Sequence, residues 1–178
     1  MQARLLTTVF VVLVAPSIAQ DWPMRGRSVN RNPATVVGLP PIDWSVGADK
    51  EPRHNVRWTA KLGFVTSGTP VVAKGLVWVG TNNGVDKPDA SVLMCFRESD
   101  GKQLYRYVSP RLPDGRNYDW PSGSLASSPL IEKNHIWFCT NRCTVVCLNI
   151  RPLTEPVSRP LCGKWICGRN TALFRDHR

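Results

Sequence analysis

Residues 70–82 read PVVAKGLVWVGTN, and residues 129–141 read PLIEKNHIWFCTN. The two stretches align without a gap at an offset of 59 residues, with proline, lysine, tryptophan, threonine and asparagine at identical positions. Self-similarity at a fixed spacing is the sequence signature of a repeat architecture. We therefore expect at least two copies of one structural unit, and the apolar pattern inside each copy indicates its type.

Each copy alternates short, β-branched apolar runs with turn residues, which favours antiparallel strands over helices. If residues 84–90 are a turn-forming insertion, the alignment extends until Cys95 meets Cys147. Four short antiparallel strands form the blade of a β-propeller, and a blade must pack against its neighbours. A β-sandwich with coincidental internal similarity is the alternative. The strands expected in the first copy are 69–73, 76–80, 91–96 and 103–108.

The first 19 residues have the layout of a secretory signal. One cation, Arg4, precedes an apolar run, and small residues at Ser17 and Ala19 precede polar Gln20. This arrangement predicts cleavage after Ala19; a buried strand or core helix is the alternative for so short an apolar run. We therefore expect an exported protein, periplasmic or extracellular, with no transmembrane segment after cleavage.

Half of the formal net charge of +10 lies in the first 19 and the last 28 residues of the chain. Residues 1–19 carry a net charge of +1, residues 20–150 carry +5 and residues 151–178 carry +4. So basic a chain invites a nucleic-acid interpretation. However, the central part intersperses its cations with acids and contains no basic block, which is typical of a solvated surface. We therefore expect no nucleic-acid partner.

The repeat resembles the pyrroloquinoline-quinone-type β-propeller repeat, in the form found in exported planctomycete-type proteins. The resemblance covers roughly residues 21–150, and residues 21–26, DWPMRG, are similar to the start of many secreted members. Tyr105 stands where the family usually has a tryptophan that docks neighbouring blades. The matching features in the first copy are Thr69 and Pro70, the apolar strands at 77–82 and 93–96, and the turn at 99–102.

The resemblance implies an all-β fold, a partial β-propeller of about two four-stranded antiparallel blades, because complete propellers need more blades than this chain can supply. The wider superfamily includes quinone-dependent alcohol dehydrogenases, which need a calcium or lanthanide ion, a catalytic aspartate and an adjacent cysteine pair. This sequence has no adjacent cysteine pair. Pyrroloquinoline quinone is therefore a cofactor by resemblance alone, and no cofactor-binding residue can be assigned to it.

The repeat pattern ends abruptly after Ile150. An offset reading frame over residues 161–170 can spell Trp-Lys-Val-Asp, which is similar to the missing strand of the second blade. One interpretation is a frame-shifted tail on a truncated protein, and a genuine divergent tail is the alternative. The expected organisation is a signal at 1–19, an N-terminal segment with a first strand at 20–68, blade 1 with its connecting loop at 69–128, a partial blade 2 at 129–150, and the divergent tail at 151–178.

No catalytic constellation stands out, because the three histidines lie far apart in the sequence. Cys139, Cys143 and Cys147 fall at every fourth position, a spacing that does not suit a zinc site, so we expect no metal ligands. If residues 140–142 are a three-residue hairpin loop, Cys139 and Cys143 stand opposite each other, within reach of a disulfide. The alternative is inert core cysteines, and Cys95 and Cys147 are expected to be small buried residues at equivalent strand positions.

These observations favour a binding or scaffold module with a protein or cell-envelope partner. Two alternatives remain open: a quinoprotein oxidoreductase of alcohols or sugars, and a fragment without activity of its own. Whether the chain is an enzyme at all is undecided from the sequence, with the weight against it. Tryptophans could stack on a planar cofactor, although tryptophan at repeat positions is more often packed between blades.

Overall fold

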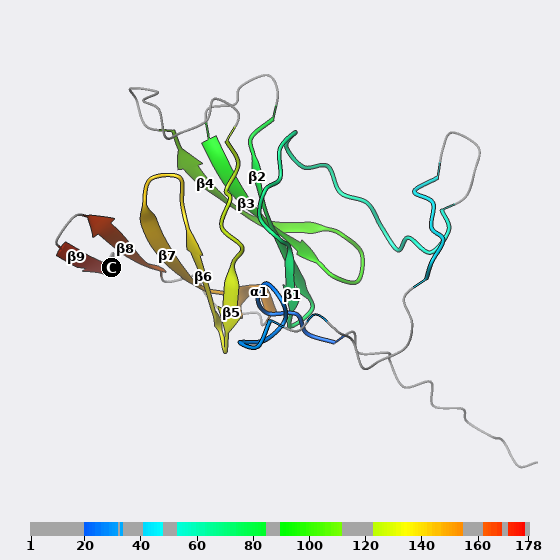
Figure 1. Ribbon diagram of the computed structural model, residues 1–178, viewed down its shortest axis with the longest axis horizontal. Coiled ribbons are helices and arrows are strands. Elements are labelled where there is room, and N and C mark those ends of the chain that lie inside the picture. The colour runs from blue at the N-terminus through cyan, green and yellow to red at the C-terminus, as the bar shows by residue number, and fades with distance from the viewer. Residues whose placement is uncertain are drawn as a thin grey trace, which may run out of the picture.

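The computed structural model is built of two antiparallel β-sheets and one helical turn, α1 (Figure 1). It describes residues 20–31, 33, 41–47, 53–84, 90–111, 123–154, 162–168 and 171–176. The expected secretory signal at 1–19 lies outside this range. Among the described residues the two sheets do not close into a ring, and no helix is long and apolar enough to cross a membrane.

The first sheet contains the four strands expected for the first copy, in sequence order. Its first hairpin turns through Lys74 and Gly75, both with positive φ (56° and 71°), the conformation of a tight type I′ turn that matches the twist of the strands. At the end of the third strand Gly101, with φ 72°, allows the chain to reverse. The strands are β1 (Val71–Ala73), β2 (Leu76–Asn82), β3 (Ala90–Arg97) and β4 (Gln103–Pro110).

The second sheet contains the three strands expected between residues 129 and 150, and two more from the tail. We expected no blade element in the tail. Instead, the tail forms α1 (Arg151–Thr154) and then two strands, of which β8 pairs with β7 and β9 pairs with β8. An exposed strand edge carries unpaired N–H and C=O groups, so pairing with β8 satisfies one edge of β7. The strands are β5 (Leu130–Glu132), β6 (His135–Cys139), β7 (Thr144–Asn149), β8 (Cys162–Gly168) and β9 (Thr171–Asp176).

The strand register repeats between the two sheets. In the first sheet Val71 pairs with Trp78, and Trp78 pairs with Cys95. In the second sheet the equivalent residues do the same: Leu130 pairs with Trp137, and Trp137 pairs with Cys147. We call the face that carries this tryptophan row face A and the opposite face of each sheet face B. The sequence repeat is therefore a structural repeat, at the level of individual cross-strand pairs.

Face A of the first sheet packs on face B of the second, and the two together form the larger hydrophobic core. Trp78 is fully buried there, and Tyr107 of β4 meets Phe138 of β6 edge-to-face at 5.1 Å between ring centroids. Burial of each large apolar side chain contributes roughly 1.5–3 kcal/mol. The buried members of this core are Val71, Ala73, Leu76, Trp78, Leu93, Cys95, Leu125, Ile131, Ile136, Phe138, Val146, Leu148 and Ile150.

Face B of the first sheet is covered by an extended segment that precedes the sheet. Trp58, Ala60 and Leu62 alternate along this segment and pack on a smaller core. The indole Nε1 of Trp58 donates a hydrogen bond to the carbonyl oxygen of Glu98 at 2.7 Å. The ring also lies against Gly101, where an added Cβ would stand 2.6 Å from the indole. The buried residues of this core are Val79, Val92, Met94 and Phe96.

A seam of polar contacts joins the inner edges of the two sheets. The backbone N–H of Thr69 donates to the Oγ of Ser128 at 2.9 Å, and Lys74 Nζ donates to the side-chain oxygen of Asn134 at 2.7 Å. The N-terminal segment fastens both sheets, because Trp22 forms a β-bridge with Val72 and the carbonyl of Pro23 accepts from the N–H of Ile131 at 2.8 Å. The two sheets are thus held by backbone and side-chain hydrogen bonds as well as by the core.

Candidate functional site

The two described histidines belong to different parts of the structure. His54 Nε2 lies 3.0 Å from the Oδ2 of Asp43 on the surface, and His135 is exposed at the start of β6. His177 is outside the described range. Within the described parts of the chain, no three residues of the His, Cys, Asp and Glu types come together as a metal-binding group. Of the described histidines, His54 therefore makes one exposed contact with Asp43, and His135 occupies a separate position in β6.

The register around Cys139 and Cys143 differs from the expected one. Cys139 pairs with Val145, and the N–H of Thr140 donates to the carbonyl of Thr144 at 2.8 Å, so the loop comprises residues 141–143 rather than 140–142. Cys143 lies inside this loop with φ 51° and does not stand opposite Cys139. Both residues are exposed free thiols in the structure. The physical reason for the shift is that Thr140 and Thr144 close the turn, with Thr140 Oγ1 accepting from the N–H of Arg142 at 3.2 Å.

Cys95 and Cys147 occupy equivalent positions in β3 and β7, and both are buried, as expected. Burial raises the pKa of the Cys95 thiol to about 12, because the thiolate would lose its hydration in the core. A thiol that stays protonated at neutral pH is a poor nucleophile. The residue therefore acts as a small core side chain rather than as a reactive group.

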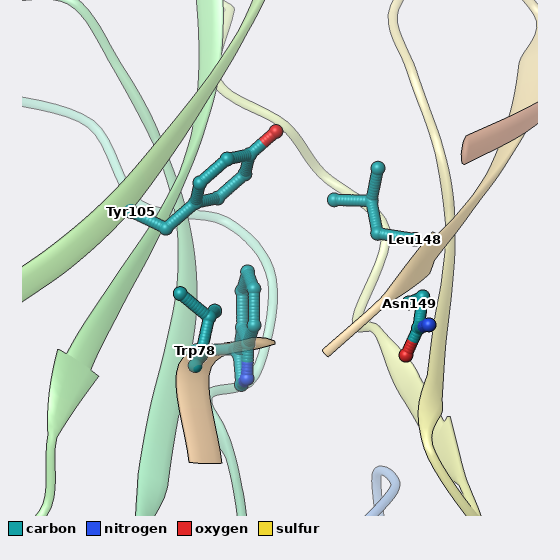
Figure 2. A pocket seen from close by; sticks show the side chains of 5 residues that line it. Trp78, Tyr105, Leu148 and Asn149 are labelled. Atoms are coloured by element: carbon teal, nitrogen blue, oxygen red, sulfur yellow. The ribbon is translucent and has the colours of Figure 1, made fainter. Parts of the chain in front are cut away.

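A small pocket opens between the two sheets beside Trp78 and Tyr105 of the first sheet (Figure 2). Leu148 and Asn149 of β7 line the opposite side, and Leu153 of α1 closes it. The cavity volume is about 10 Å³, close to the smallest that holds one water molecule. No described residue offers an acceptor within hydrogen-bonding distance of Trp78 Nε1, which is buried. This pocket is too small for a planar cofactor.

Face A has different surroundings in the two repeat units. Leu130 is 39% exposed, and Trp137 and Val145 are half-buried; all three stand outside both cores. Their equivalents in the first sheet are Val71, Trp78 and Leu93, which are fully buried against a neighbouring sheet. The residues Leu130, Trp137 and Val145 form what we call the open face. Apolar side chains that gather on one accessible face are a candidate for an interaction site.

A second exposed apolar row lies on residues 41–47, which one isolated β-bridge joins to residues 53–55; we call these two stretches the arm. Ile42 is 99% exposed, Trp44 69% and Val46 56%. Ser45 pairs with His54 through backbone hydrogen bonds of 2.9 and 3.0 Å, which holds this stretch extended. The three apolar residues occupy alternate positions in the sequence, so they form one row of exposed apolar side chains along this stretch.

Sequence reasoning missed both the arm and the covering segment with Trp58. The alternation of Trp58, Ala60 and Leu62 was visible, because apolar residues at every second position indicate a half-buried strand. The same signal is present at Ile42, Trp44 and Val46. Nothing in the sequence distinguishes the row that is covered from the row that is exposed, since this depends on contacts distant along the chain.

No protein-family model matches the sequence, and no curated protein matches it either. The assignment to a class of protein therefore depends on the repeat, the stacking of the two sheets and the surfaces described above.

Proposed function

We propose that this chain is an exported binding or scaffold module built from two units of the pyrroloquinoline-quinone-type propeller repeat. The observation that carries the proposal is the difference between equivalent faces: Val71, Trp78 and Leu93 of face A are fully buried in the first unit, whereas Leu130, Trp137 and Val145 of face A are exposed or half-buried in the second. Units that stack A on B leave one face A for another partner at the end of the stack. The partner is a protein or a component of the cell envelope, met in the periplasm or outside the cell.

The stack supports binding better than catalysis. The pocket beside Trp78 has room for about one water molecule, while the open face presents apolar side chains on a rigid sheet. Side chains fixed on regular strands lose little freedom when a partner binds. The open face is therefore the surface by which such a module would hold its partner.

Cosedimentation with the isolated envelope of the producing cell tests this proposal. The purified chain is expected to bind saturably at concentrations where it is monomeric, and Leu130→Glu with Val145→Glu is expected to lower the association constant at least tenfold. Val108→Glu is the matched control, because Val108 is an exposed strand residue away from the open face. Equal binding by all three proteins, or none by the unaltered chain, would contradict the proposal.

The oxidoreductase alternative has its own assay. The chain is incubated with pyrroloquinoline quinone and calcium, and reduction of an artificial electron acceptor is followed with alcohols and sugars. A module is expected to give the same rate with and without the quinone. A quinone-dependent rate would replace the proposal with a quinoprotein oxidoreductase.

The third candidate is a fragment without activity of its own, and the open face is also the observation that favours it. Face A is buried in the first unit, so leaving the equivalent face in water in the second unit lowers stability. Nucleotide sequencing of the locus separates the candidates: propeller repeats in an offset frame beyond residue 150 support the fragment, and their absence supports the module.

A further inference from the structure

The open face and the arm are two apolar surfaces without a cover in the described parts of the chain. The two hydrophobic cores include no residue of the open face and neither Ile42 nor Trp44 of the arm. The open face is formed by paired strands, whereas the arm is held by a single isolated β-bridge. The open face is therefore part of a sheet, and the arm is a stretch of chain outside any sheet.

The molecule already shows how an extended segment covers a repeat sheet. Face B of the first sheet is covered by Trp58, Ala60 and Leu62, an alternating row with a tryptophan at one position. The arm carries the same kind of row in Ile42, Trp44 and Val46. The arm thus has the spacing and the apolar side chains of a segment that packs across a sheet.

The arm and the open face lie far apart within one molecule. Figure 1 shows the arm, in cyan, on one side of the molecule, and β8 and β9, in brown and red, on the opposite side. Ile42 and Trp44 are exposed, so the arm does not cover the open face of its own molecule. The two surfaces can meet when they belong to different copies.

We propose that the arm of one copy binds the open face of a second copy, so that the chain assembles head to tail. Trp44 of one molecule would pack beside Trp137 of the next, as Tyr105 packs beside Trp78 at 6.1 Å between centroids within one molecule. Such a contact joins two different surfaces, and it leaves one arm and one open face unused at the ends of every pair. The assemblies therefore become larger as the protein concentration rises, and they either close into a ring or grow as a filament.

This inference goes beyond the proposed function and does not depend on it. A chain that binds an envelope partner without self-association would contradict the inference and leave the proposed function intact. A chain that self-associates without binding an envelope partner would support the inference and contradict the proposed function.

Sedimentation velocity of the full chain over roughly a hundredfold range of concentration is the first test. The weight-average mass is expected to rise steadily with concentration. Trp44→Ser removes the tryptophan of the arm, and Leu130→Lys places a charge on the open face. Each change is expected to lower the association constant by about tenfold or more, because aromatic and apolar anchors dominate such contacts. Both positions are exposed, so circular dichroism is expected to show an unchanged fold.

Mixing the two variants gives the decisive result. The Trp44→Ser protein keeps its open face and the Leu130→Lys protein keeps its arm, so an equimolar mixture is expected to form pairs and to stop there. In each pair, the arm that stays unbound carries Trp44→Ser, and the open face that stays unbound carries Leu130→Lys. A head-to-tail contact therefore predicts that two proteins that are monomeric alone give a defined dimer together.

Several outcomes would overturn the proposal. If Trp44→Ser associates like the unaltered chain while Leu130→Lys does not, two open faces meet each other instead. If both variants still aggregate, the association is non-specific, and if the unaltered chain stays monomeric there is no assembly. Val29→Ser and Val108→Ser are the matched controls, because both residues are exposed apolar positions outside the arm and the open face; their association is expected to equal that of the unaltered chain.

Discussion

Trp78 and Trp137 occupy the same position in two copies of one repeat, yet they have different surroundings. Trp78 is fully buried between the sheets, while Trp137 is half-buried on a face without a neighbouring sheet. The first sheet is covered on both faces, by the second sheet and by the segment with Trp58. An identical residue in an identical register therefore has a different role in each copy, because the role depends on the layer that covers it.

Substitution of the two tryptophans has the largest expected effect and tests this comparison directly. Trp78→Ala is expected to lower the free energy of unfolding by about 3–5 kcal/mol, because it leaves a cavity in the closed core. Trp137→Ala is expected to cost roughly 1 kcal/mol, since part of the ring is already in water. Urea denaturation measures both, and equal losses would show that face A of the second sheet is as well covered as that of the first.

Substitution of Gly101 tests the cover on face B of the first sheet. Gly101→Ala is expected to cost about 2–3 kcal/mol, because the new methyl group meets the ring of Trp58 and the backbone has φ 72°. Gly75→Ala is the matched control: its φ is 71° and its Cβ would meet open space, so about 1 kcal/mol is expected. A similar loss at both positions would mean that Trp58 moves aside at no cost.

The cysteines also differ between core and surface: Cys95 is buried, whereas Cys139 and Cys143 are exposed. Because the folded pKa of Cys95 is about 12 and its ordinary value is 9.0, the native state holds this proton more tightly than the unfolded state. Its contribution to stability is complete below about pH 9 and is lost as the pH rises toward 12, at ~1.4 kcal/mol per pH unit. Cys95→Ala is expected to flatten this part of the stability profile.

Alkylation of the native protein followed by peptide mapping checks the same cysteines. Cys139 and Cys143 are expected to react quickly and Cys95 slowly. Protection of Cys139 and Cys143 that disappears with a reductant would instead establish a disulfide between them, together with a shifted hairpin register.

The smallest expected effect concerns the turn of the first unit. Asp100 accepts a hydrogen bond from the N–H of Lys102 and contacts Arg97, and both interactions lower the pKa of its carboxyl group. The stabilisation is present above the ordinary pKa of 3.8 and is lost as the pH falls through the lower folded value. Asp100→Asn is expected to shift the urea midpoint slightly at pH 7 and not at all at the acid end, and a shift of equal size at both pH values would rule out the charge.

The strands of the repeat were predictable because local signals agree there. Turn residues such as Lys74 and Gly75 separate apolar runs of strand length, and the second copy repeats them. The register of the hairpin between β6 and β7 was not predictable, because residues 140–144 offer two loops that differ by one position. The side chains of Thr140 and Thr144 decide between them.

The candidate site was predictable in part. The equivalence of Trp78 and Trp137 follows from the alignment, but their different exposure depends on which sheet faces which. The pairing of the tail with β7 was also outside the reach of the sequence pattern, since residues 151–178 do not match the repeat. An unpaired strand edge accepts a partner through its backbone, and backbone pairing leaves little trace in side-chain identity.

The seam between the sheets has a consequence for how such a protein could arise. Thr69 and Ser128 are equivalent positions in the two copies, and they bond to each other. A single ancestral unit with a small hydroxyl residue there would supply both the donor and the acceptor of this contact after one gene duplication. The first contact between the duplicated units would then need no further mutation, and later divergence could be confined to the residues that decide what each outer face meets.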